Sequence, residues 1–90
     1  MTMQASKRAA TIGTGIGSVV AKYGDEIWEL ICDEFPCDRP FSTAAAGQML
    51  KIKFGKWSER YEREIARAVL LTVEDQGHGV VRRHGHSWII

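Results

Sequence analysis

Residues 77–90 read GHGVVRRHGHSWII. Two runs within this stretch, residues 79–83 and 86–90, are rich in the β-branched and aromatic side chains that are typical of β-strands. They are joined at His84-Gly85, and glycine tolerates the positive φ angle of a tight hairpin turn. We therefore predict a β-hairpin here.

This hairpin needs a surface to pack on, because two strands alone are unstable in water. Its apolar side chains, Val81, Trp88 and Ile90, are expected to lie against helices. Its basic side chains, Arg82 and Arg83, are expected to project outward near the tip. The stretch therefore predicts a helical body that carries a basic hairpin.

Three helices are predicted before the hairpin. From Ser18 to the proline at Pro36, apolar residues recur at spacings of three and four, which places them on one helix face. Ser42 and Ser58 each offer a side-chain oxygen that can cap the start of a further helix. The last of these helices, SERYEREIARAVLLTVEDQ, is expected to end at Gly77.

The second helix, STAAAGQMLKI, is favoured by its three alanines. Ala45, Met49 and Ile52 form its expected apolar side. Gly47 in its middle costs about 1 kcal/mol relative to alanine, and we interpret it as the point where another helix approaches closely.

The order of three helices and a hairpin predicts a mainly α domain with a C-terminal β-hairpin, specifically a three-helix winged helix-turn-helix over residues 18–90. Residues 1–17 are small, polar and glycine-rich and show no helical or strand period. We predict that they form a flexible N-terminal arm. A chain of 90 residues is long enough for one domain.

The charge is unevenly distributed along the chain. Residues 1–50 carry four bases and six acids, a net charge of −2, whereas residues 51–90 carry eight bases and five acids, a net charge of +3. Such a split indicates a charged partner or simply two solvated faces. No apolar run approaches the roughly 20 residues that cross a bilayer, so we expect no membrane partner and a cytoplasmic protein.

Two cysteines, Cys32 and Cys37, have a spacing that fits neither a redox pair nor a zinc finger. Cys32 is expected to be a small buried apolar side chain, although a bridge between the two remains open.

Basic side chains on the third helix and the hairpin predict contact with a nucleic acid. Arg60, Arg63 and Arg67 are spaced three and four apart and would form one exposed stripe that addresses a DNA groove. The residues expected to hold phosphates are Lys51, Lys53, Lys56, Arg82 and Arg83. The interleaved acids offer a different interpretation, in which Arg63 with Glu59 and Arg60 with Glu64 stabilise the helix.

From Phe41 to Trp88 the chain resembles winged-helix modules, in particular the C-terminal module of phage and plasmid primase–helicase proteins of the virulence-associated E type. The matching segments are FSTAAAGQML, FGKWSERYEREIARAVL and GVVRRHGHSWII. The resemblance implies contact with double-stranded DNA, with the third helix in or near the major groove. It implies no catalytic centre.

An acidic side of the first helix supports an alternative. In this hypothesis the chain is a small phage-type inhibitor or adaptor, for example anti-CRISPR-like, that binds a basic protein surface. The residues expected at that interface are Asp25, Glu26, Trp28, Glu29 and Asp33. The same acidic residues are also explained if this side of the helix simply faces solvent and binds no partner.

No nucleophile–base pair, phosphate loop or metal-ligand pattern is recognisable in the sequence. His78, His84 and His86 lack a neighbouring acid pattern that would complete a metal site. We therefore expect a non-enzymatic protein without metal or cofactor, and we leave open whether it forms a homodimer.

Overall fold

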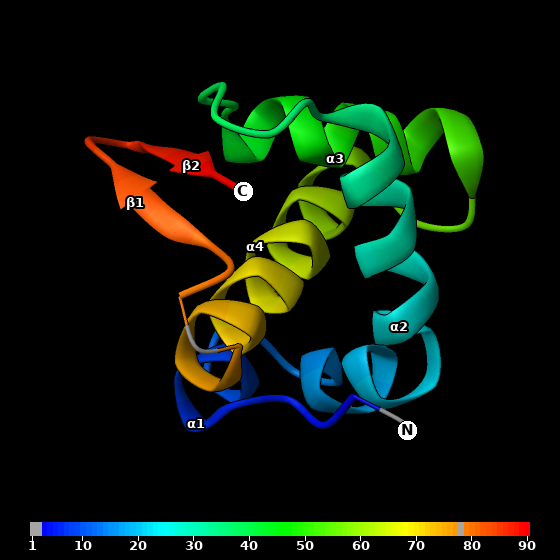
Figure 1. The fold of residues 1–90 in the computed structure, drawn as a ribbon. Coiled ribbons are helices and arrows are strands. Elements are labelled where there is room, and N and C mark those ends of the chain that lie inside the picture. Colours follow the sequence, from blue (N-terminus) through cyan, green and yellow to red (C-terminus); the bar gives the residue numbers. More distant parts are fainter. Residues whose placement is uncertain (1–2, 78) are drawn as a thin grey trace.

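A computed structural model describes residues 3–77 and 79–90 (Figure 1). The helices within these residues are α1 (Lys7–Ala10), α2 (Ile16–Glu34), α3 (Thr43–Lys53) and α4 (Glu59–Gln76). They are followed by an antiparallel hairpin of β1 (Arg82–His84) and β2 (Ser87–Ile89). The prediction of a mainly helical domain with a C-terminal hairpin is confirmed.

Serine side chains set the starts of three helices. The Ser42 hydroxyl accepts the backbone N–H of Ala45 at 3.0 Å, and the Ser58 hydroxyl accepts that of Tyr61 at 3.4 Å. Both caps are those predicted from the sequence, and Ser6 caps α1 in the same way. The first long helix, α2, begins at Ile16, two residues before the predicted start at Ser18.

Helix α4 lies at the centre of the domain, with α1, α2 and α3 packed around it (Figure 1). Its buried residues include Ile65, Val69 and Leu70. At the crossing with α3, a Cβ atom on Gly47 would lie 3.0 Å from Arg63 Cα. The interpretation of Gly47 as a point of close helix approach is therefore confirmed.

The apolar side of α3 differs from the prediction. Ile52 is 72% exposed, and Ala46 and Leu50 are buried together with the expected Met49. The buried face of α3 is thus rotated about the helix axis relative to the predicted one. The reason is that Gly47 must lie on the side of α3 that contacts α4. A short helix rich in alanine carries too few large side chains to fix that face from the sequence.

The hairpin packs as predicted, through Val81 and a fully buried Trp88. Its register pairs Arg82 with Ile89 and Arg83 with Trp88, so the turn lies at Gly85–His86, one residue later than expected. The positive φ of the turn, 62°, is at Gly85.

Phe41 forms a bridge to the hairpin across 47 positions of sequence. Its backbone N–H donates to the Trp88 carbonyl at 2.9 Å, and the Trp88 N–H donates to the Phe41 carbonyl at 2.8 Å. The Trp88 indole N–H donates to Thr43 Oγ1 at 2.9 Å. These bonds attach the hairpin to the start of α3.

The N-terminal segment differs from the predicted flexible arm. Residues 7–10 form α1, and Ala9 and Ile16 are fully buried. The Ser6 N–H donates to Thr72 Oγ1 on α4 at 3.2 Å. Small side chains and a helix of one turn leave no period in the sequence, which is why this packing was not predicted.

Cys32 is exposed, so the prediction of its burial is wrong. It lies on α2 next to the buried Ile31, on the side that faces solvent. Cys37 is also exposed, and the two thiols are not bridged. Among the described helices, none is both long and apolar enough to cross a membrane.

Candidate nucleic-acid interface

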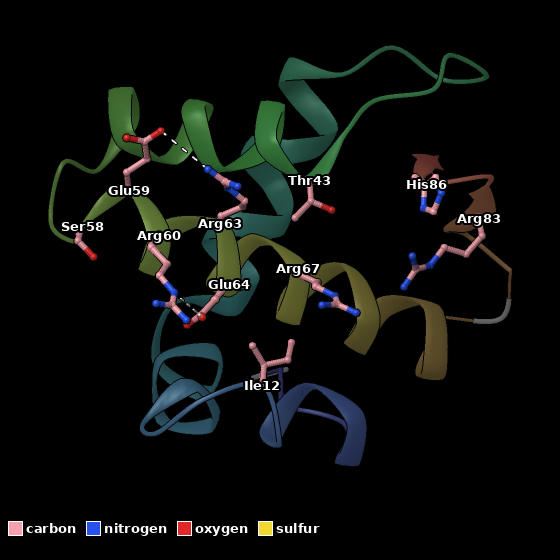
Figure 2. A pocket seen from close by; sticks show the side chains of 10 residues that line it. All are labelled: Ile12, Thr43, Ser58, Glu59, Arg60, Arg63, Glu64, Arg67, Arg83 and His86. Carbon is pink, nitrogen blue, oxygen red and sulfur yellow. Dashed lines mark ion pairs between the residues drawn. The ribbon is translucent and has the colours of Figure 1, made fainter.

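An open groove of about 1040 Å³ runs along the exposed side of α4 to the hairpin (Figure 2). It is lined by residues from four parts of the chain: the N-terminal segment, the start of α3, α4 and the hairpin. These residues are Ile12, Thr43, Ser58, Glu59, Arg60, Arg63, Glu64, Arg67, Arg83 and His86. The groove therefore depends on the tertiary fold.

Three arginines of α4 form the central row of the groove. Arg60, Arg63 and Arg67 follow one another at spacings of three and four, so they lie on one side of the helix (Figure 2). The side chain of Arg60 is 92% exposed and that of Arg63 is 54% exposed. The predicted arginine stripe is thus present and accessible.

The hairpin contributes Arg83 and His86 to the other end of the groove (Figure 2). The Arg83 guanidinium carbon lies 3.8 Å from the centroid of the Trp88 ring, and Arg83 Nε lies 3.5 Å from a carboxylate oxygen of Glu74. Cation–π stacking and this ion pair hold the guanidinium beside α4.

The groove carries more positive than negative charge. Four arginines line it against two glutamates. The predicted helix pairs are confirmed, with Arg60–Glu64 at 3.6 Å and Arg63–Glu59 at 3.9 Å. Arg67 forms no ion pair within the described part of the chain. The geometry leaves the Arg67 guanidinium available to an anion.

Two helix starts also face the groove. Ser58 is the N-cap of α4 and Thr43 is the first residue of α3, and both line it. The N-terminal end of a helix carries a partial positive charge. This contribution adds to the arginines, although Glu59 at the start of α4 offsets part of it.

The structure does not bring all predicted phosphate contacts together. Lys51 and Lys53 are exposed on α3 but do not line the groove. Arg82 points away from it and lies 3.8 Å from Asp38, because successive residues of a strand face opposite sides. Of the two hairpin arginines, Arg83 is therefore the one that belongs to the site.

Lys56 contacts an aromatic cluster instead of the groove. Its Nζ donates to the Tyr23 hydroxyl at 3.3 Å and lies 4.8 Å from the centroid of that ring. This hydrogen bond lowers the pKa of Tyr23, and the charge of Lys22 acts in the same direction. Phe54 and Trp57 pack edge-on and complete the cluster.

Sequence reasoning missed Ile12, Thr43 and Ser58 as lining residues, and it assigned no nucleic-acid contact to His86. Ile12 falls in the segment that was predicted to be a flexible arm, so no local pattern indicated it. Thr43 and Ser58 were expected as parts of helix starts, and their position beside the groove depends on how α3 and α4 pack.

The acids predicted for a protein interface lie on the outer side of α2. Asp25, Glu26, Glu29 and Asp33 are exposed, and none forms an ion pair with another described residue. Trp28 is half-buried and lines, with Asp25, a smaller cavity of about 340 Å³ beside the N-terminal segment. This face is separate from the basic groove.

Two further observations concern polar groups outside the groove and the acidic face. Within residues 3–77 and 79–90, no three His, Cys, Asp or Glu side chains gather in a way that could hold a metal ion. Glu62 on α4 is 1% exposed, and neither of its carboxylate oxygens has a hydrogen-bond partner among the described residues. His78 lies outside the described residues.

Comparison of the chain with protein-family models, with curated proteins and with solved structures gave no match.

Proposed function

We propose that this domain binds DNA without catalysing a reaction, and that the basic groove is its contact surface. The observation that carries the proposal is the convergence of Arg63, Arg67 and Arg83 from two distant segments on one concave surface. Arginine forms strong, directional hydrogen bonds with phosphate oxygens. An excess of positive charge in the groove would attract the negatively charged backbone of a nucleic acid.

The finer fold assignment, a winged helix-turn-helix, belongs to the same proposal. Helices α2, α3 and α4 would take the places of its three helices, and the β1–β2 hairpin that of its wing. The bridge from Phe41 to Trp88 supports this assignment, because it ties the hairpin to the segment between α2 and α3. Helix α1 is an addition to that plan. The order of helices and hairpin and the Phe41–Trp88 bridge are also the grounds on which we propose the resemblance to virulence-associated E type modules.

Binding to phosphates releases counterions, so it depends on salt. Each phosphate contact on a duplex contributes a slope of about −0.9 to a plot of log K against log salt concentration. Four arginine contacts would give a slope of about −3.6. A sequence-independent binder of this kind has a Kd of roughly 10⁻⁴ to 10⁻⁶ M at physiological salt.

The test is fluorescence anisotropy with a labelled DNA, offered both as a duplex and as a single strand, at several salt concentrations. The groove variant is Arg63→Gln/Arg67→Gln. The matched control is Lys51→Gln/Lys53→Gln, which removes the same charge from exposed positions outside the groove. We expect the groove variant to lose more than tenfold in affinity, and the salt slope to fall by about 1.8 with a duplex or about 1.4 with a single strand.

Two results would overturn the proposal. One is a Kd weaker than about 10⁻⁴ M for both forms of DNA at physiological salt. The other is an equal loss of affinity in the groove variant and in the lysine control, because the groove would then have no special role.

A second candidate function is protein binding through the acidic face of α2. It is favoured by the exposure of Glu26, Glu29 and Asp33 without ion pairs to other described residues. A basic protein surface would supply the missing partners. The test is a charge reversal, Glu29→Lys/Asp33→Lys. A protein that binds wild type and the Arg63→Gln/Arg67→Gln variant equally, but not the reversed variant, supports this candidate. If the charge-reversed variant still binds that protein as tightly as wild type, this candidate function is contradicted.

A further inference from the structure

The exposed part of α4 is a strip one residue wide. In residues 64–74, all of which are described, Arg67 is the one exposed residue. Glu64 and Glu74 at the two ends of this stretch are half-buried, and the residues between them, apart from Arg67, are buried. Helix α4 is therefore enclosed by its neighbours along most of its length.

Both sides of the strip are bordered by other parts of the chain. On one side α3 approaches so closely that a Cβ on Gly47 would lie 3.0 Å from Arg63 Cα. On the other side the Tyr61 hydroxyl donates to the Thr14 carbonyl at 3.4 Å. Figure 2 shows the arginines of α4 between α3 and the segment that carries Ile12.

This enclosure conflicts with insertion of α4 into a major groove. A major groove is about 12 Å wide and about 8.5 Å deep, and a helix with its side chains is about 10–12 Å across. A recognition helix must therefore protrude beyond its neighbours to reach the base edges. Helix α3 and residues 12–14 would meet the DNA backbones before α4 could enter.

A single strand fits the same surface. Arg60, Arg63 and Arg67 are separated by about 4.5 Å and about 6 Å along the helix axis, and Arg83 extends the row onto the hairpin. A positively charged groove that follows one backbone is the usual means of binding single strands, and guanidinium planes can also stack on unpaired bases.

We infer that the groove binds one nucleic-acid strand, with phosphates along the arginine row, and does not read the major groove of a duplex. This inference rests on the proposed function and specifies the form of its ligand. It replaces the double-stranded partner expected from the sequence with a single-stranded one.

The test compares three labelled probes by anisotropy over a range of salt concentrations. They are oligothymidylate of twelve nucleotides, the same strand annealed to its complement, and a polyglutamate of matched charge. We expect the single strand to bind at least tenfold more tightly than either other probe. Four contacts to a single strand would give a salt slope of about −2.8.

The outcomes separate the inference from the proposed function. Equal or tighter binding of the duplex overturns the inference and leaves the proposed function intact. Binding of neither nucleic acid overturns both. Polyglutamate that binds as tightly as the strand also overturns the inference, because the groove would then select charge alone.

A pair of single substitutions tests the position of the strand. Arg67→Gln removes one charge from the row, and Arg82→Gln removes one charge from the hairpin outside the groove. We expect Arg67→Gln to weaken single-strand binding about fivefold or more and to reduce the slope by about 0.7. Arg82→Gln should change the affinity less than twofold. A larger effect of Arg82→Gln contradicts the assigned path, provided that circular dichroism shows both variants folded.

Discussion

The guanidinium group of Arg83 lies over the indole ring of Trp88, with 3.8 Å between its carbon atom and the ring centroid. The same indole is fully buried and donates its N–H to Thr43 at the start of α3. This one side chain therefore attaches the hairpin to the start of α3 and also stacks against a cation of the groove. Trp88 thus contributes both to the packing of the hairpin and to the position of the Arg83 guanidinium.

We predict that Trp88→Ala destabilises the domain by about 3–5 kcal/mol, because it removes a fully buried aromatic side chain and leaves a cavity. Total stabilities of small domains are about 5–15 kcal/mol, so this loss would remove a large share of the free energy of unfolding. Urea denaturation measures the effect. Ile52→Ala is the control, because its side chain is 72% exposed and its loss should cost less than about 0.5 kcal/mol.

Gly47→Ala should destabilise the domain by about 1–3 kcal/mol, although alanine favours the helical state. The added Cβ would meet the backbone of Arg63 at 3.0–3.2 Å, and a backbone cannot rotate away. Gly17→Ala is the matched change in α2, where the Cβ would meet Ala10 at 3.9 Å. That variant should be unchanged or more stable by up to about 1 kcal/mol. Equal thermal midpoints for the two variants would contradict the close helix approach.

Glu62→Met should stabilise the domain by about 1–3 kcal/mol, because the wild-type carboxylate is buried without a hydrogen-bond partner among the described residues. Methionine fills a similar volume and requires no partner. The comparison variant is Glu59→Met, whose side chain is 69% exposed in the wild type, and it should change the unfolding free energy little. A clear loss of stability in Glu62→Met would contradict this prediction, because it would show that the carboxylate forms a stabilising hydrogen bond or ion pair.

The attachment of α1 to α4 should depend on pH. Arg8 pairs with Glu74 at 2.6 Å and with Asp75, and its hydrogen bond lowers the pKa of the Asp75 carboxyl, with a smaller effect from Ser6. A carboxyl with a lowered pKa in the folded state stabilises the protein above its unfolded pKa of about 3.9. That contribution disappears as the pH falls through the folded value.

Asp75→Asn should therefore be less stable than wild type near neutral pH, and the difference should shrink progressively below about pH 4. Unfolding free energies from urea curves between pH 7 and pH 2 measure this. In an Arg8→Gln background, Asp75→Asn should have a much smaller effect, because the partner is already gone. A difference that persists unchanged to pH 2 would mean that the ion pair is not its cause.

Local chemistry in the sequence determined the helix starts and the presence of the hairpin. Ser42 and Ser58 cap α3 and α4 through hydrogen bonds to residues three positions later, so the signal lies within one turn. The spacing of apolar residues also predicted which side of α4 is buried, and the apolar residues around Trp88 predicted that the hairpin packs on the helices. The arginine row on α4 follows from the same helical period.

Tertiary structure alone decided which cations share the groove. Arg83 joins Arg67 because the Phe41–Trp88 bridge ties the hairpin to the start of α3 and Arg83 pairs with Glu74 of α4, whereas Lys51 and Lys53 lie on α3 outside the groove. The packing of α1 and the enclosure of α4 likewise depend on contacts between residues more than forty positions apart. Such contacts leave no period in the local sequence, because their free energy arises only when distant surfaces meet.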